Sequence, residues 1–280
     1  MKTQLNFLFW LWCCFIRSGM FMTRLPLDWL HPKRNVSMST GATAMFFPVW
    51  GLIIAMISML LVMPLVWFDV PLVVVSTVLL FLGTILSGAL HEDGFADCCD
   101  GFWGGQTPEA RHQIMKDSTV GSYGAIGLIA SFLLRWICLV QVESALGILL
   151  FIVMHTVPRG FLGILWASFP LWQGGGLAKA RPSRLQGLVG LLLMVLMLFL
   201  EMPPMASGLI LLFCGLGMLL FCLLALRKLG GLNGDCFGGA EQFGQIILFQ
   251  RFTSSGLFTF WRPLLLFEKS LADLWIGRIK

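Results

Sequence analysis

Four of the fourteen acidic residues fall within nine positions, in the string HEDGFADCCDG that runs from position 91 to position 101. Asp93, Asp97 and Asp100 are spaced i, i+4, i+7, and a helix places such residues within roughly 60° of arc on one face. Three neighbouring carboxylates repel one another unless a cation lies among them. An all-oxygen ligand set with room for water suits Mg²⁺ or Mn²⁺ better than Zn²⁺. The spacing therefore predicts a divalent-metal site.

The alternative is a solvated helix end whose charges only terminate an apolar segment. Such ends usually carry basic partners, whereas no Lys or Arg lies between His91 and Gly104. Two zinc motifs are also excluded, because HExxH would need a histidine where Phe95 stands and the string PCxxC does not occur. The metal interpretation is the favoured one.

Two further polar strings could contribute to the same chemistry. KDSTVGSYG contains Asp117, which is either a metal ligand, a general base or a helix N-cap. LNGDCFGGAEQFG contains Glu241 and also Asp235, which either joins the site or caps a helix. The glycines at 121, 124 and 127 recur every three residues, which indicates close helix packing more often than a phosphate cradle.

Three basic side chains lie inside apolar segments, where burial is costly unless they face the protein interior. Arg159 is the strongest functional candidate among them and could clamp a phosphate. Arg135 lies nearer the outer side and is expected to extend towards lipid headgroups. His155, four residues before Arg159, is either a satisfied interior histidine or a catalytic one.

Composition predicts an all-α, polytopic integral membrane protein. The chain is 58% hydrophobic and 12% charged, whereas soluble domains are roughly a quarter charged. Six apolar runs have lengths near the ~20 residues that span a bilayer, and a seventh, 243–261, is interrupted by polar residues. Six or seven transmembrane helices are therefore expected. The six runs are Met45 to Trp67, Leu72 to Leu90, Ser122 to Gln141, Leu146 to Phe169, Leu185 to Leu200 and Ala206 to Leu226.

The distribution of basic residues predicts the orientation. With a cytoplasmic N-terminus, every Lys and Arg outside the apolar runs falls on the inner side, while the outer turns carry only Asp69, Glu143 and Glu201. We therefore expect a protein of the cytoplasmic (inner) membrane with both termini in the cytoplasm. The connections 91–121, 170–184 and 227–242 would share the cytoplasmic face and hold the active site.

Three regions are expected along the chain. Residues 1–44 form an N-terminal interfacial or cytoplasmic segment, since the apolar stretch Leu5 to Ile16 is followed by Arg17 and Arg24 and by no cleavage site. Residues 45–248 form the transmembrane catalytic domain with its acidic loop 91–121, and residues 249–280 form a tail of open topology. The eight cysteines lack the CxxC spacing of metal sites and are interpreted as free thiols.

These features favour some functions over others. Basic residues form no patch, so nucleic-acid binding is not expected, and no Walker A string occurs. Carboxylates that hold divalent ions at a membrane surface suit the transfer of a phosphoryl-linked group. An ion-coupled transporter is the alternative, although it would be expected to show repeated halves and midplane charges.

Four strings also carry a resemblance to a known family. HEDGFADCCDG, KDSTVGSYG and LNGDCFGGA, together with FMTRLP at 21–26, resemble the cobalamin synthase family, the adenosylcobinamide-GDP ribazoletransferases, over about residues 20–248. The resemblance implies a membrane enzyme of coenzyme B12 assembly. It would join adenosylcobinamide-GDP to α-ribazole or its 5′-phosphate in the presence of Mg²⁺ and release GMP. Whether it works as a homo-oligomer stays open.

By the same resemblance, roles carry over to individual residues. Asp93, Asp97 and Asp100 are implied as metal-binding acids, and Asp117 and Asp235 as matching acidic positions, with catalysis expected of both and metal binding also of Asp117. Arg24, Lys116, Ser118, Arg159 and Asn233 are expected to contact substrate. The chain departs from the family pattern at three positions, which are Glu92 where an apolar residue is usual, and Gln242 and Gln245 where glutamates are expected.

Overall fold

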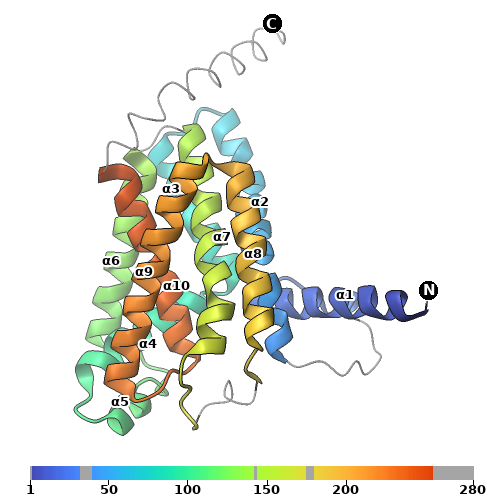
Figure 1. The fold of residues 1–280 in the computed structure, drawn as a ribbon. Helices are drawn as coiled ribbons and strands as arrows, with labels where there is room; N and C mark the ends of the chain where they lie inside the picture. The colour runs from blue at the N-terminus through green and yellow to red at the C-terminus, as the bar shows by residue number, and fades with distance from the viewer. Residues whose placement is uncertain (1, 32–39, 142–143, 175–179, 255–280) are drawn as a thin grey trace, which may run out of the picture.

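The structure, a computed structural model, describes residues 2–31, 40–141, 144–174 and 180–254. Apart from short turns, these residues are helical, and the only β-type pairing among them is an isolated bridge between Leu171 and Leu232. The helices stand side by side as a bundle (Figure 1). Their bounds are α1 Lys2–Met22, α2 Phe47–Trp67, α3 Leu72–Ser87, α4 Leu90–Gly104, α5 Pro108–Ile114, α6 Ser122–Gln141, α7 Ser144–Ser168, α8 Arg184–Glu201, α9 Pro204–Leu229 and α10 Gly234–Ser254, with 3-10 turns at Asp28–Leu30 and Thr40–Phe46.

The predicted polytopic membrane bundle is confirmed, with fewer full-length spans than expected. In the described residues, α2, α6, α7 and α9 are each long and apolar enough to cross a bilayer. The pair α3 and α4 meets that test only when the two are taken together, and α8 is shorter. The structure thus supports four spans, or five if the bent pair counts as one.

The outer surface of the bundle is apolar, as a lipid-facing surface must be. On α6, Ile126, Ile129 and Leu133 are exposed, whereas Ser131 and Arg135 on the opposite face are buried. Apolar surface of this extent is rare on water-soluble monomers. The helices therefore place their few polar groups inside and their leucines and isoleucines outside.

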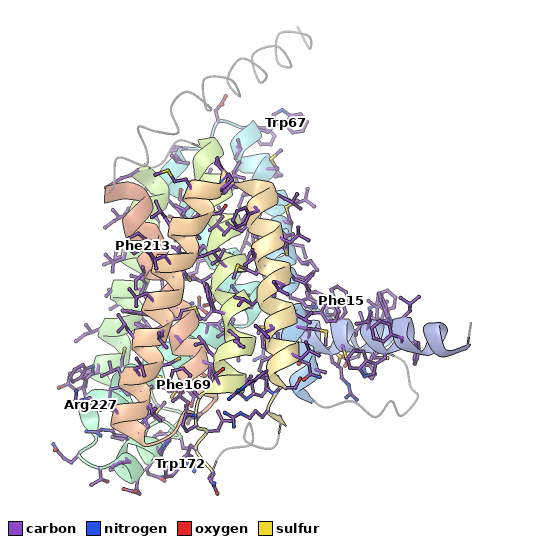
Figure 2. The ribbon with its side chains drawn as sticks, in the orientation of Figure 1. Phe15, Trp67, Phe169, Trp172, Phe213 and Arg227 are labelled. Carbon is purple, nitrogen blue, oxygen red and sulfur yellow. The ribbon has the colours of Figure 1, made fainter. Side chains whose placement is uncertain are left out.

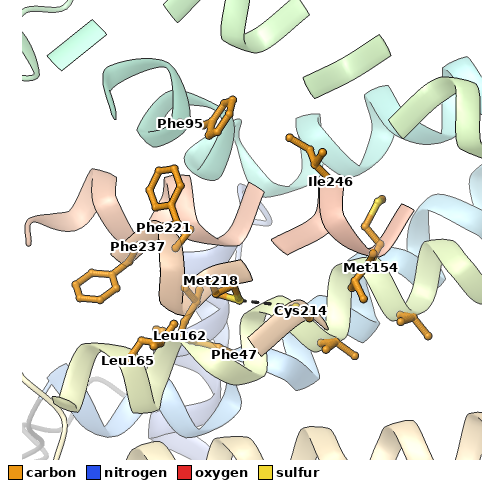
Figure 3. Packing of buried hydrophobic residues seen from close by; sticks show 14 of the residues in the cluster. Phe47, Phe95, Met154, Leu162, Leu165, Cys214, Met218, Phe221, Phe237 and Ile246 are labelled. Atoms are coloured by element: carbon orange, nitrogen blue, oxygen red, sulfur yellow. Dashed lines mark hydrogen bonds between the residues drawn. The ribbon is translucent and has the colours of Figure 1, made fainter. Parts of the chain in front are cut away.

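The interior is filled by side chains from α7, α9 and α10. Figure 3 shows Leu162 of α7 next to Met218 of α9, and Met154 of α7 further along, near Ile246 of α10. None of the eight cysteines forms a disulfide, as expected from their spacing, and seven of them are buried. The thiols therefore serve as small apolar core groups.

Three connections come together at one end of the bundle, which we call the acidic end. Arg111 Nη1 donates to the Lys228 carbonyl at 2.6 Å, and Trp172 N donates to the Leu232 carbonyl at 2.9 Å. His112 stacks on Trp172 with ring centroids 4.0 Å apart. Trp172 and Arg227 lie at this end, while Trp67 lies at the other (Figure 2). The predicted grouping of the connections is confirmed; their cytoplasmic side stays a prediction.

Helix α1 lies across the bundle axis and projects away from it (Figure 1). The predicted stretch Leu5 to Ile16 falls inside this longer helix. Trp50 Nε1 of α2 donates to the Phe15 carbonyl at 2.8 Å, and the two rings stack 4.8 Å apart. A helix held at this angle is suited to the membrane interface.

A two-residue break turns α4 through 88° from α3. Gly88 and Ala89 both have left-handed backbone, with φ of 66° and 55°, and Gly88 N donates to the Ile85 carbonyl at 3.0 Å. The run Leu72 to Leu90 is therefore not one straight span, because it contains the break and ends on the first residue of the next helix. The break aims the acidic helix across the acidic end.

Replacing Gly88 with Ala is expected to destabilise the protein by about 1–2 kcal/mol from the left-handed backbone alone, with a further loss because a Cβ there meets the Arg24 side chain. Gly230 is the matched control, since its φ is 73° but no other atom lies within 4 Å of a Cβ added there. Thermal unfolding in detergent should show a larger shift for Gly88→Ala than for Gly230→Ala. Equal shifts would show that Arg24 moves aside at no cost.

Candidate functional site

A cavity of about 210 Å³ opens at the acidic end between α1, α2, α4, α7 and α10. Its walls are mostly apolar and aromatic, but two carboxylates, Asp93 of α4 and Asp235 of α10, lie in its lining. Concave, largely apolar sites with a few converging polar groups are the usual form of small-molecule sites. The cavity is therefore the candidate active site. Its other principal residues are Phe21, Phe47, His91, Trp166 and Phe237.

Glycines let α4 and α10 approach closely enough to bring the two acids together. A Cβ at Gly94 would lie 2.8 Å from the Asp235 carbonyl oxygen, and one at Gly238 would lie 3.3 Å from the Leu90 carbonyl oxygen. Asn233 then fixes the start of α10. Its Oδ1 accepts from Cys236 N at 3.1 Å, while its Nδ2 donates to Asp235 Oδ2 at 2.8 Å.

Asn233 is therefore the N-cap of α10 and also the partner that orients Asp235. Of the two alternatives for Asp235, capping the helix is excluded, because Asn233 takes that role. Asp235 lines the cavity instead. The predicted contact of Asn233 with substrate stays a prediction.

The three aspartates of α4 lie on a helix, as their spacing predicts, but their surroundings differ. Asp93 is exposed at the cavity, and Asp97 is half-buried. The negative charges of Asp235 and Asp93 both repel a negative charge on Asp97. Asp100 is buried, and its two carboxylate oxygens accept from Gly121 N at 2.8 Å and Gly124 N at 2.9 Å.

Asp100 thus accepts from two of the N–H groups at the start of α6. A carboxylate is also favoured there by the helix dipole. Of the alternatives left open for Asp117, the N-cap is excluded, because Asp100 of another helix takes that role. The close packing expected of the glycines is confirmed, since a Cβ at Gly121 or Gly124 would clash with Asp100.

Replacing Asp100 with Asn is expected to lower the stability of the protein by about 1–2 kcal/mol, since one N–H group loses its acceptor. The Mg²⁺ concentration needed for half-maximal activity should not change. Asp69→Asn, in an exposed turn, is the control for the loss of one charge. A several-fold rise in the required Mg²⁺ would instead identify Asp100 as a metal ligand.

Asp117 lies in the loop between α5 and α6. Its Oδ1 accepts from Thr119 N at 3.0 Å and from Thr119 Oγ1 at 2.8 Å. The hydrogen bond from the Thr119 side chain, and to a smaller extent the one from its backbone, lowers the pKa of Asp117. A lower pKa makes Asp117 a weaker base. Asp117, Lys116 and Ser118 are exposed and do not line the cavity. Their roles stay predictions.

Arg159 lies behind the cavity in a buried polar network. Its Nη1 is 2.6 Å from Glu241 Oε1, and its Nη2 is 3.1 Å from His91 Nδ1. Its Nη1 also donates to the His155 carbonyl at 2.9 Å. Arg159 is 1% exposed and does not line the cavity, so its predicted phosphate contact stays a prediction. His155 is a buried histidine with its Nδ1 next to Arg159, as the interior interpretation expects.

The expected extension of Arg135 towards lipid headgroups is wrong. Arg135 is 2% exposed, and its Nη1 donates to Gln245 Oε1 at 2.8 Å and lies 3.5 Å from Glu92 Oε1. Gln245 Nε2 in turn donates to Glu241 Oε1 at 2.8 Å. Two of the positions that depart from the family pattern, Glu92 and Gln245, therefore meet in one network around Arg135.

Arg24 lies close to the cavity from the other side. It is exposed, its side chain covers Gly88, and it follows Phe21 and Met22, which line the cavity. Its backbone N donates to the Leu86 carbonyl at 2.9 Å. An exposed guanidinium here is available to an anionic ligand.

The oxygen ligands that Asp93 and Asp97 offer suit Mg²⁺. Mg²⁺ is typically held by one or two carboxylates with waters and substrate phosphates. Asp93 and Asp97 lie one helical turn apart, and Asp93 faces the cavity. Within the described ranges, no group of three or more His, Cys, Asp or Glu side chains is arranged to hold a metal ion. The fit is therefore to an ion shared with a substrate, not to an all-protein cage.

The fold and the site define a polytopic membrane protein with an acidic, aromatic-walled cavity at one end of its bundle. The family model described as cobalamin-5-phosphate synthase matches residues 14–252, and the chain belongs to this family of enzymes. No solved structure matches the chain.

Relatives with the printed name adenosylcobinamide-GDP ribazoletransferase are similar over most of their length. The protein from Shewanella baltica (strain OS185) is 33% identical over 242 residues, covering 82% of this chain and 89% of the relative. The one from Sinorhizobium sp is 32% identical over 241 residues, covering 82% and 92%. The one from Bradyrhizobium diazoefficiens is 33% identical over 238 residues, covering 82% and 89%. The resemblance found in the four strings is thereby confirmed.

The aromatic walls of the cavity could not be found from the sequence. Phe21, Phe47, Trp166 and Phe237 belong to four different helices, and the chain has many other phenylalanines and tryptophans. Only the fold distinguishes those that face the acids from those that face lipid.

Proposed function

We propose that this protein is an adenosylcobinamide-GDP ribazoletransferase. It joins adenosylcobinamide-GDP to α-ribazole or its 5′-phosphate, forms adenosylcobalamin or its 5′-phosphate, and releases GMP. Membership in the cobalamin-5-phosphate synthase family supports this proposal. The observation that carries it is that Asp93 and Asp235, from the two motifs HEDG and LNGD, line one cavity at the acidic end.

The reaction needs one bond to form and one to break. A ribose hydroxyl oxygen of the ribazole forms a bond to the cobinamide-side phosphorus, while the bond from that phosphorus to the oxygen of GMP breaks. The hydroxyl proton passes to a carboxylate. Asp235 is suited to accept it, because Asn233 holds its Oδ2 in place while it lines the cavity.

The remaining groups bind and orient the pyrophosphate. Bound Mg²⁺ would neutralise the pyrophosphate charge and stabilise the leaving oxygen, with Asp93 and Asp97 as the residues that hold it. Arg24, exposed beside the cavity, supplies a cation for the phosphates of adenosylcobinamide-GDP. The basic residues of the connections support a site on the cytoplasmic face of the inner membrane.

The test is a product assay with the purified full-length protein in liposomes. Adenosylcobinamide-GDP and α-ribazole are supplied with Mg²⁺ or with EDTA, and corrinoids and GMP are separated by chromatography and identified by mass. We expect equal amounts of GMP and cobalamin product with Mg²⁺ and none with EDTA. Substrate-dependent ion flux in sealed vesicles without GMP would contradict the proposal and favour a transporter.

A further inference from the structure

The cavity has a second property beyond its two carboxylates, which is the arrangement of its aromatic walls. On one side, Phe21 and Phe47 stack with ring centroids 5.8 Å apart and an interplanar angle of 20°. On another side, Trp166 and Phe237 lie 6.5 Å apart at 45°. Aromatic walls of this kind favour a flat ring system, since ring pairs in offset or edge contact gain energy beyond area burial.

Trp166 also carries an unused hydrogen-bond donor. Its side chain is 5% exposed, and within the described part of the chain its indole N–H has no hydrogen-bond partner. A buried donor left unpaired is costly, and native proteins pair most of them with protein, water or ligand. Because Trp166 lines the cavity, a ligand acceptor there can supply the missing partner.

We infer that this cavity binds the benzimidazole ring of the ribazole substrate, and that the Trp166 indole N–H donates to the free nitrogen of that ring. The inference rests on the proposed function and decides which of the two substrates occupies the cavity. With the ring between the aromatic walls, the attached ribose reaches Asp93 and Asp235. Trp166 is then a residue that determines specificity and does not take part in bond making.

Three other candidate ligands, a corrinoid ring, a guanine and a lipid chain, fit the cavity less well. A corrinoid ring is far larger than about 210 Å³ allows. The guanine of the other substrate presents several donors and acceptors on its edges, each of which would need a partner in mostly apolar walls. A benzimidazole nucleoside has one free ring nitrogen and otherwise apolar edges. A lipid chain would leave the Trp166 N–H and both carboxylates unpaired.

The first test measures the effect of Trp166→Phe, which keeps an aromatic ring and removes the N–H. In liposomes with both substrates, the KM for α-ribazole should rise about 3- to 10-fold, the range expected for one net hydrogen bond. The KM for adenosylcobinamide-GDP should stay within about 2-fold, as expected for a substrate that does not touch this group. Trp67→Phe, at the opposite end of the bundle (Figure 2), is the matched control and should change neither.

A second test separates the hydrogen bond from a packing effect. An indole riboside has the same shape as the benzimidazole nucleoside but lacks the acceptor nitrogen. The wild-type protein should prefer the benzimidazole form several-fold, and Trp166→Phe should lose that preference. If Trp166 had a purely structural role, Trp166→Phe would weaken the binding of both compounds equally.

The outcomes are distinct. A change in the KM for adenosylcobinamide-GDP alone would assign the cavity to the guanine nucleotide and overturn the inference. An unchanged KM for both substrates, or equal discrimination by both proteins, would also overturn it. If the wild-type protein releases no GMP, the proposed function fails first. Equilibrium dialysis against labelled α-ribazole then tests the inference separately. Equal binding by wild type and Trp166→Phe overturns it, and so does the absence of binding to either protein.

Discussion

Replacing Asp93 with Asn is expected to lower GMP release about 100- to 1,000-fold, the loss typical when one preorganised electrostatic group is removed from an active site. Asp93 is the acid of α4 that faces the cavity. The amide keeps the shape of the side chain but loses the charge that balances a divalent cation. The measurement is the initial rate of GMP formation by purified protein in liposomes over a range of Mg²⁺ concentrations.

Glu109→Gln is the control for this variant. Glu109 is exposed on α5, also near the acidic end, but it does not line the cavity. Its neutralisation should leave the rate within about 2-fold, as surface changes away from the reacting groups usually do. Normal turnover by Asp93→Asn, with an unchanged Mg²⁺ requirement, would remove Asp93 from the mechanism. Thermal unfolding of both variants checks that the fold is kept.

Replacing Glu241 with Leu is expected to destabilise the protein by about 3–5 kcal/mol, the usual loss when one member of a buried ion pair is removed. Glu241 is fully buried and pairs with Arg159, which is 1% exposed. Without the carboxylate, the guanidinium charge stays in the bundle interior unpaired. The midpoint of thermal unfolding in detergent should fall by roughly 10 °C.

The double variant Arg159→Met with Glu241→Leu separates this cause from a loss of packing. Removing both charges leaves no unpaired ion, so much of the stability should return. If the double variant is no more stable than Glu241→Leu alone, the loss comes from packing and the ion pair is not its source. An unchanged midpoint in Glu241→Leu would show that water reaches Arg159.

Local patterns predicted the helices well, because apolar runs in this chain end at polar residues. The run Ser122 to Gln141 matches α6 at both ends, and the i, i+4, i+7 acids do lie on one helix. The break at Gly88 and Ala89 could not be read in the same way. An alanine with a φ of 55° carries no sequence signal, and the apolar run continues through the break to Leu90.

The partners of the buried polar groups could not be predicted, because they are set by packing between distant segments. The N-terminus of α6 is capped by Asp100, 21 residues away, and not by the nearby Asp117. Arg135 is paired with residues 43 and 110 positions away. Sequence proximity offered Asp117 as one possible cap for α6, and it favoured the lipid surface for Arg135.

Helix α1 gives this cavity an unusual dependence on its surroundings. Phe21 and Met22, near the end of this crosswise helix, supply part of the cavity wall, while the rest of α1 extends beyond the bundle (Figure 1). The wall of the cavity is thus completed by a helix that we expect to lie against lipid. Extraction into a short-chain detergent removes that lipid. The affinity for α-ribazole should therefore fall in detergent and recover on return to a bilayer, even where the bundle itself has stayed folded.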